Sequence, residues 1–160
     1  MKQPSVYLET SVVSALVDER NDPVRVVRHD ATLRWWQEER HRFRLFTSEA
    51  VFWELSKHPL LNTREVLAYL DEMIRLPLND DVEGAATVYQ EQLLMPKEEV
   101  GDAVHLAVAS VHKMEYLLTW NCRHLANINK IRHLQAINRR LGLMSPILLT
   151  PEMLILGGEK

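Results

Sequence analysis

The chain has 160 residues, of which 46% are hydrophobic and 26% are charged, and its formal net charge is −3. This composition is that of an ordinary folded protein, and the small negative charge excludes binding of nucleic acid by bulk charge alone. The single cysteine, Cys122, excludes a disulfide framework within the chain, and no apolar run is long enough to span a membrane. We therefore expect one domain over residues 1–156, a frayed tail over residues 157–160, and a cytoplasmic protein.

The first half of the chain alternates short apolar strands with helical segments. We predict strands at residues 5–9 and 43–47, and helices at residues 12–17, 24–40, 49–57 and 63–74. In the second of these helices, apolar residues recur at intervals of three and four, which predicts a buried face made of Val24, Val27, Ala31 and Trp35. The fourth helix is predicted to reach Ile74 on its inner face.

The second half continues the alternation. We predict strands at residues 76–78, 115–120 and 146–150, helices at residues 81–94, 103–113 and 128–141, and a short closing helix from Pro151. Met-Pro-Lys at 95–97 should break the first of these helices, Gly142 should end the last, and Pro77 favours an edge strand. Strands that alternate with helices in this way predict an α/β fold of three layers, with a mostly parallel sheet of about four to five strands between helices.

Four polar residues lie where strands end or helices begin, or beside a buried helix face. Glu9 ends the first strand, and Asn121 follows the strand at 115–120. Asp102 opens an almost wholly apolar helix, and Glu54 borders the buried stripe of its helix. Because open α/β sheets bind ligands at the carboxyl ends of their strands, we expect these four side chains to meet there.

Each of the four residues also has a simpler interpretation when taken alone. Asp102 can be an acid that the helix dipole favours in a first turn, and Glu54 can be a solvated helix residue. Glu9 can be a strand end that faces water, and Asn121 can be a turn residue. The hypothesis of a site depends on their combination, because the four residues converge in only one kind of fold.

Three carboxylates in one pocket repel each other unless a cation lies between them. Oxygen ligands of this kind suit Mg²⁺ or Mn²⁺, and the sequence has no cysteine and histidine spacing typical of zinc sites. A hard cation at such an edge suits phosphoryl transfer, because it binds the phosphate and activates water. Thr10, Ser11 and Thr119 are then candidates to contact the scissile phosphate or to support the ligands.

The charge pattern near the end of the chain is one-sided. From Tyr116 through Pro151 there is no Asp or Glu, whereas the segment contains Arg123, Lys130, Arg132, Arg139 and Arg140, with His124 and His133. A basic flank beside an acidic pocket suits a phosphodiester substrate, which makes Arg123 and His124 candidates for substrate binding. A solvated helix face with a chance bias of charge is the alternative.

The remaining histidine and tryptophan residues of interest are interpreted as structural. His105 lies one helical turn after Asp102 and is in reach of a substrate, but we interpret it as packed and bonded to a backbone carbonyl. Trp35, Trp36 and Trp53 are interpreted as core or interface residues rather than as platforms for bases.

Four segments together resemble the PIN domain family and, within it, the VapC-type toxins of toxin–antitoxin pairs. They are Tyr-Leu-Glu-Thr-Ser at 7–11, Thr-Ser-Glu-Ala-Val-Phe-Trp-Glu-Leu at 47–55, Gly-Asp-Ala-Val-His-Leu-Ala-Val-Ala at 101–109, and Leu-Leu-Thr-Trp-Asn-Cys-Arg-His-Leu-Ala-Asn at 117–127. Their order and spacing fit across nearly the whole chain. The resemblance implies a PIN-like α/β/α fold, a Mg²⁺- or Mn²⁺-dependent ribonuclease, a homodimer, and inhibition by a small antitoxin protein.

The resemblance also implies which residues act. Carried over by position, the three acids that hold the metal and catalyse are Glu9, Glu54 and Asp102, and Asn121 stands where many members have a fourth acid. Two positions depart from the family pattern, since Glu9 replaces the usual Asp and Asn121 is neutral. An asparagine can still bind a hard cation through its carbonyl oxygen.

Three hypotheses follow. The first is a toxin-type endoribonuclease in which Glu9, Glu54 and Asp102 hold Mg²⁺ or Mn²⁺, while Asn121 binds the ion or orients the attacking water. The second, suggested by the two departures, is a PIN-like module that holds RNA or a protein without cutting. The third is a Mg²⁺-dependent hydrolase of small phosphate esters, but that class often has a second Asp two residues after a nucleophilic Asp, which residues 9–11 lack.

Overall fold

The computed structural model describes residues 2–58, 62–92, 94 and 100–155, and a parallel sheet lies at its centre. The strands are β1 (Ser5–Leu8), β2 (Arg44–Ser48), β3 (Ile74–Leu76), β4 (Tyr116–Leu118) and β5 (Ile147–Leu149). Their order is β3-β2-β1-β4-β5, and every neighbouring pair is parallel. The apolar strand β1 lies in the middle and is buried along its whole length, as expected for a strand covered on both faces.

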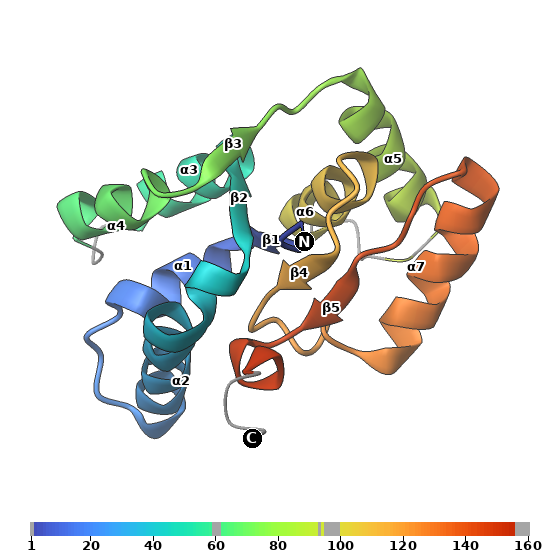
Figure 1. Cartoon of the computed structure of the whole chain (residues 1–160). Coiled ribbons are helices and arrows are strands. Elements are labelled where there is room, and N and C mark those ends of the chain that lie inside the picture. Colours follow the sequence, from blue (N-terminus) through green and yellow to red (C-terminus); the bar gives the residue numbers. More distant parts are fainter. Residues whose placement is uncertain (1, 59–61, 93, 95–99, 156–160) are drawn as a thin grey trace.

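Helices cover both faces of the sheet. Figure 1 shows α1 to α4 gathered on one side of it and α5 to α7 on the other. Their bounds are α1 (Thr10–Val17), α2 (Pro23–Glu39), α3 (Glu49–Ser56), α4 (Thr63–Leu70), α5 (Asp80–Glu91), α6 (Val100–Val111) and α7 (Ile128–Leu141), with 3-10 turns η1 (Arg40–Arg42) and η2 (Pro151–Leu154). The predicted three-layer α/β/α fold is confirmed.

The sequence determines several of the helix ends directly. The Asp22 side chain accepts a hydrogen bond from the backbone N–H of Arg25, and Pro23 occupies the first helical position of α2. Asn79 caps α5 in the same way through the N–H of Val82. Gly142 ends α7 with a φ of 72°, a left-handed conformation that glycine adopts without strain. The predicted end of α7 and the predicted start of η2 at Pro151 are therefore confirmed.

The boundary between α4 and β3 differs from the prediction. The helix ends at Leu70, and Ile74 begins β3, where its backbone pairs with Phe46 of β2. The helix was expected to continue because Ile74 keeps the four-residue spacing, but its side chain is 57% exposed. The strand thus starts two residues before the predicted position, and Pro77 follows it at the edge of the sheet, as predicted.

The predicted buried face of α2 is wrong in its first turns. Val24 and Val27 are 59% and 61% exposed. The buried residues of α2 are Thr32, Trp35, Trp36 and Glu39. The helix is therefore anchored by its second half.

Two predictions concern residues outside the described part of the chain, namely the break at residues 95–97 and the tail at residues 157–160. Within the described ranges, none of the helices is long and apolar enough to cross a lipid bilayer.

Candidate active site

The carboxyl ends of the neighbouring strands β1 and β4 hold Glu9. Its backbone N–H donates to the carbonyl oxygen of Leu118 at 3.1 Å, and the residue is the N-cap of α1. The side chain is buried, with 5% of the residue exposed. Its Oε1 accepts hydrogen bonds from the hydroxyl of Thr119, at 2.7 Å, and from the hydroxyl of Ser11. Two hydroxyl donors thus fix one carboxylate at the edge of the sheet.

A chain of hydrogen bonds joins this carboxylate to Asp102 in the first turn of α6. The backbone N–H of Asn121 donates to Thr119 Oγ1 at 3.0 Å, and Asn121 Nδ2 donates to Asp102 Oδ2 at 3.0 Å. Asn121 Oδ1 in turn accepts from the backbone N–H of His124 at 3.0 Å. The neutral amide of Asn121 therefore donates to a carboxylate through Nδ2 and orders the loop after β4 through Oδ1. An ionised carboxylate in its place has no hydrogen to donate to Asp102.

Glu54 reaches the same region from α3. Its Oε1 accepts a hydrogen bond from Thr10 Oγ1 at 2.7 Å and pairs with Nε2 of His105, which lies on α6 one turn after Asp102. Gly101 makes this approach possible, because a Cβ on it would lie 2.8 Å from Oε2 of Glu54. The glycine thus sets the distance between the carboxylate and the start of α6.

The negative charges of all three acids affect the pKa of the buried His105 imidazole. Burial alone would lower its pKa, but the hydrogen bond to Glu54 and the charges of Glu9, Glu54 and Asp102 outweigh burial and raise it. For Glu54, burial acts to raise the pKa, but the bond from His105 prevails and the pKa is lowered. The charged form of each partner is thus favoured by the other.

The interpretation of His105 as bonded to a backbone carbonyl is wrong. Its Nδ1 shares a hydrogen bond with the hydroxyl of Tyr7 at 2.7 Å, and that hydroxyl is also 2.7 Å from Ser48 Oγ. Burial raises the pKa of Tyr7 far above its usual value, so the phenol stays protonated. The sequence did contain a signal for this network, because a tyrosine in the middle of a buried strand needs a partner for its hydroxyl.

The structure brings together most of the predicted site residues. Glu9, Asp102 and Asn121 belong to one hydrogen-bonded group, and Glu54 belongs to a second group with Thr10 and His105; the two groups together are called the acidic network. The hydroxyls of Thr10, Ser11 and Thr119 donate to its carboxylates. His124 contributes its backbone N–H to Asn121, and Arg123 is exposed beside it.

Arg123 lines an open hollow of 530 Å³ next to the acids. The hollow is formed by Ser11, Arg28, Trp120, Asn121, Cys122 and Arg123. Arg28 comes from α2, and its guanidinium lies 5.5 Å from the ring centroid of Trp120. The indole is itself held by a hydrogen bond of 2.7 Å from Nε1 to Thr32 Oγ1. Sequence reasoning did not find Arg28, because nothing in the sequence places the middle of α2 beside Asn121.

The donors at this site have the chemistry that a hard divalent cation requires. Glu9, Glu54 and Asp102 offer carboxylate oxygens, and Asn121 offers an amide oxygen, all within the acidic network. Within the described residues, however, no three histidine, cysteine, aspartate or glutamate side chains are grouped to hold one ion as they stand. The residue types fit Mg²⁺ or Mn²⁺, while Glu54 is engaged with Thr10 and His105.

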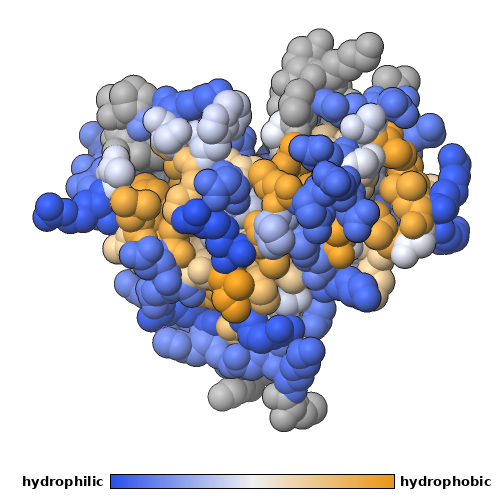
Figure 2. Space-filling model, turned by 90° about the horizontal axis from the view of Figure 1, so that it is seen from above, coloured by the Kyte–Doolittle hydropathy of each residue, from blue (hydrophilic) through white to orange (hydrophobic). Residues whose placement is uncertain are grey.

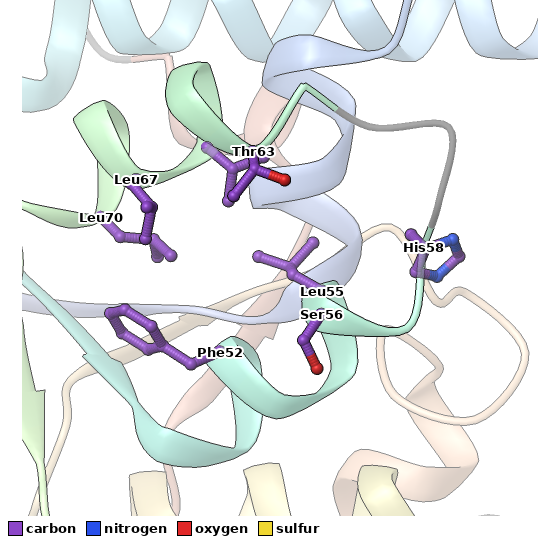
Figure 3. Close-up of a pocket in the computed structure, with 8 residues that line it drawn as sticks. Phe52, Leu55, Ser56, His58, Thr63, Leu67 and Leu70 are labelled. Atoms are coloured by element: carbon purple, nitrogen blue, oxygen red, sulfur yellow. The ribbon is translucent and has the colours of Figure 1, made fainter.

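A separate hollow of 210 Å³ lies between α3 and α4. Figure 3 shows Phe52, Leu55, Leu67 and Leu70 pointing into it from the two helices. Its other lining residues are Ser56, His58, Thr63 and Val66. None of the proposed acids lines it, so this hollow is not a candidate for phosphodiester chemistry.

Comparison with known families gives one match. The model of the PIN domain matches residues 6–131, which include Glu9, Glu54, Asp102 and Asn121. None of the curated proteins compared with the sequence matches it.

Three solved structures resemble this one in fold. VapC20 of Mycobacterium tuberculosis, described as a toxin that cleaves the sarcin–ricin loop, has a TM-score of 0.55 and 21% identity, over 75% of this chain and 92% of that one. A toxin–antitoxin complex from Klebsiella pneumoniae has a TM-score of 0.53 and 14% identity, over 79% of this chain and 94% of that one. VapBC2 from Rickettsia felis, bound to a DNA fragment from its promoter, has a TM-score of 0.51 and 13% identity, over 91% of this chain and 97% of that one.

Proposed function

The chain belongs to the PIN domain family, and on that premise we propose that it is a metal-dependent endoribonuclease, the toxin of a toxin–antitoxin pair. One observation carries the proposal. Glu9 and Asp102, which are far apart in the sequence, are joined through Thr119 and Asn121 at the carboxyl edge of the sheet, and Glu54 pairs with His105 one helical turn after Asp102. Acids are brought together in this way at considerable electrostatic expense, which a bound cation removes.

The chain's own residues have defined tasks in this proposal. Glu9, Glu54 and Asp102 hold Mg²⁺ or Mn²⁺, and the bound ion supplies charge to the phosphate and activates water. Ser11 and Thr119 fix Glu9, Thr10 and His105 fix Glu54, and Asn121 fixes Asp102 through its amide. Each carboxylate is thus oriented by a neighbour before an ion arrives.

The RNA backbone is proposed to lie in the arginine-lined hollow. Arg28 and Arg123 offer guanidinium groups beside Ser11 and Asn121, so a phosphate there is within the same hollow as the acidic network. His124, next in the chain, is proposed to contact the substrate as well. This positive flank offsets the repulsion between a polyanion and the acids.

The experiment that tests the function is cleavage of single-stranded and structured RNA by the purified protein with Mg²⁺ or Mn²⁺. We expect cleavage that EDTA abolishes. Asp102→Asn should lower the rate by at least about 100-fold, because the ion is worth several kcal/mol in the transition state.

Circular dichroism and the unfolding midpoint provide the control for folding. Asp102→Asn should leave both nearly unchanged, since asparagine keeps the size of the side chain and its place beside Asn121. Cleavage at the wild-type rate by this variant, or cleavage that persists in EDTA, would contradict the proposal.

A second function is favoured by one observation. Because no three acids or histidines among the described side chains are grouped around one ion, the domain can also be a PIN-like module that holds RNA or a protein without cutting it. Glu9 in place of aspartate and the neutral Asn121 point the same way. RNA that binds tightly but stays intact with millimolar Mn²⁺ would support this alternative.

The proposal extends to partners and setting. Similar folds occur in toxin–antitoxin complexes, which supports a small antitoxin as the partner of this chain, and we propose that the toxin is a homodimer. Light scattering of the protein, alone and co-expressed with the neighbouring gene product, tests these two partners.

The proposal also covers the extent of the domain and its location. Residues 1–156 are proposed to form one domain, because two elements beyond the matched residues belong to the same fold: β5 completes the sheet and η2 packs on α2. A cytoplasmic location follows from an intracellular RNA substrate, and the exposed thiol of Cys122 suits a reducing compartment.

A further inference from the structure

A hollow of 560 Å³ has Glu54 in its wall. It is lined by Glu49, Ala50, Trp53, Glu54, Leu78, Gly101 and Val104. Leu78 lies in the link between β3 and α5, which crosses the top of the molecule in Figure 1. Figure 2 looks down on this side and shows hydrophobic surface exposed among hydrophilic side chains. The volume lies within the range of sites that hold small organic groups.

Trp53 is the prominent side chain of this hollow. It is 62% exposed, whereas Trp35, Trp36 and Trp120 are 0%, 6% and 6% exposed. The ammonium of Lys57 lies 3.3 Å from its ring centroid, so a cation–π contact orders the indole although it faces solvent. Leaving such a ring exposed forgoes the stabilisation that burial of an aromatic side chain gives. Of the two sequence interpretations of Trp53, core or interface residue, the core assignment is therefore wrong.

Both charged residues in the walls of the hollow are acids. Glu49 is paired with Arg75 through a bond of 2.9 Å. Glu54 is the acid that pairs with His105, and Gly101 directly precedes Asp102. Ala50, Trp53, Leu78 and Val104 supply apolar surface between them. A ligand that fits this hollow therefore needs a flat apolar part that lies on the indole and a second part that reaches the acidic network.

We propose that this hollow is a nucleobase subsite, in which a base next to the scissile phosphate of single-stranded RNA stacks on Trp53. The inference rests on the proposed function, because it uses the acidic network as the place where the phosphate is cut. Proteins bind unpaired bases by stacking them on aromatic rings, and every base offers such a face. Lys57 adds a positive charge near the backbone of the stacked nucleotide. The arginine-lined hollow, beside Ser11 and Asn121, and this hollow, beside Glu54, then receive neighbouring nucleotides of the same strand.

Tryptophan fluorescence tests this subsite directly, since only one of the four indoles is substantially exposed. In the Asp102→Asn background, which binds without cutting, acrylamide should quench the emission of Trp53 in the free protein. Saturating single-stranded RNA should protect that emission. An RNA series in which each nucleotide in turn lacks its base should include one position whose loss abolishes the protection.

Two substitutions complete the test. Trp53→Leu should weaken RNA binding by roughly 5- to 100-fold, while Trp53→Phe should keep most of the affinity, because phenylalanine still stacks. The penalty of the critical abasic position should vanish in Trp53→Leu. Met153→Ala, which removes another exposed apolar side chain, is the control and should bind like the parent.

Other results have separate meanings. RNA that the wild-type protein cuts, and that binds the Asp102→Asn protein while Trp53 stays fully accessible to acrylamide, would overturn the subsite and leave the proposed function standing. Protection of Trp53 without RNA, rising with protein concentration, would identify the hollow as a protein interface and also overturn the inference. RNA that does not bind at all would remove both proposals.

Discussion

Hydroxyl groups do much of the positioning at the acidic network. Thr119 Oγ1 donates to Glu9 at 2.7 Å and accepts from the backbone N–H of Asn121 at 3.0 Å, so one side chain ties the carboxylate that follows β1 to the loop after β4. The hydroxyl of Thr10 donates to Glu54 at 2.7 Å. A carboxylate that accepts hydrogen bonds in its charged form is held in one orientation, which prepares it to bind a cation.

Gly101 offers a substitution that separates stability from activity. Gly101→Ala places a Cβ 2.8 Å from Oε2 of Glu54, so the carboxylate must move. We expect RNA cleavage to fall by about 10- to 100-fold, since small displacements at an active site have effects of this size. Stability should not fall, because alanine is favoured over glycine within helices by ~0.5–1 kcal/mol.

Gly84→Ala is the matched control, since a Cβ on this residue of α5 meets nothing within 4 Å. It should raise stability in urea denaturation and leave cleavage unchanged. Equal activity of the two alanine variants would show that the position of Glu54 does not matter.

Tyr7 is expected to be a stabilising residue through its hydroxyl. Tyr7→Phe leaves the buried Nδ1 of His105 and the hydroxyl of Ser48 each without this partner. The free energy of unfolding should fall by about 1–3 kcal/mol, measured by urea denaturation. Tyr69→Phe, in a partly exposed ring packed edge-on against Trp36, should change it by less than ~0.5 kcal/mol. A loss no larger for Tyr7→Phe than for Tyr69→Phe would contradict the role of the network.

The acids of the site could be predicted from the sequence, but their supports could not. Glu9 and Asp102 follow directly from a strand end and a helix start. The bond between Tyr7 and His105 joins residues 98 positions apart, and it exists because β1 lies between β2 and β4 in the sheet. Strand order is a property of the whole fold, and local patterns do not contain it. Trp53 was misassigned for a related reason, since a helical spacing does not say which turns stay uncovered.

Among the helices and strands, α7 is joined to its neighbours through one buried amide. Asn138 Oδ1 accepts from the hydroxyl of Tyr89 on α5 at 2.6 Å. Its Nδ2 donates to Ser110 on α6 and to Ser145 after α7, each at 3.0 Å. This residue therefore fixes α5, α6 and α7 relative to one another on their face of the sheet.

Asn138→Ala should lower the free energy of unfolding by about 2–4 kcal/mol, because it removes these bonds and leaves buried hydroxyls unpaired. Asn129→Ala, on the exposed side of the same helix, should have an effect near zero. Chemical denaturation of both variants gives the comparison, and an equal loss in the two would refute the assignment.

Element boundaries show where periodicity is reliable. Strands β1, β2 and β4 lie where branched and aromatic residues predicted them, within about two residues, because their burial on both faces demands apolar runs. At β3, one of the two edge strands, the same reasoning failed, and Ile74 was assigned to a helix. Only Leu76 of the three residues of β3 is buried, so this strand has no apolar pattern that distinguishes it from the end of a helix.

The molecule as a whole has a small negative charge, yet Arg28 and Arg123 are placed beside the acidic network. If Arg28 contacts an RNA phosphate, the affinity should depend on salt through counterion release. Arg28→Gln should weaken binding at low salt and reduce the slope of log affinity against log salt by about 0.7. Arg34→Gln, an exposed residue of α2 that pairs with Glu38 at 3.0 Å, is the control and should leave the slope unchanged.

The binding of Mn²⁺ measured by titration calorimetry bears most directly on the idea that Glu9, Glu54 and Asp102 form one cation site. The wild-type protein should give a saturable heat below millimolar Mn²⁺, and Asp102→Asn should lose it while remaining folded by circular dichroism. A folded wild-type protein that takes up no Mn²⁺ at millimolar concentration would contradict the account.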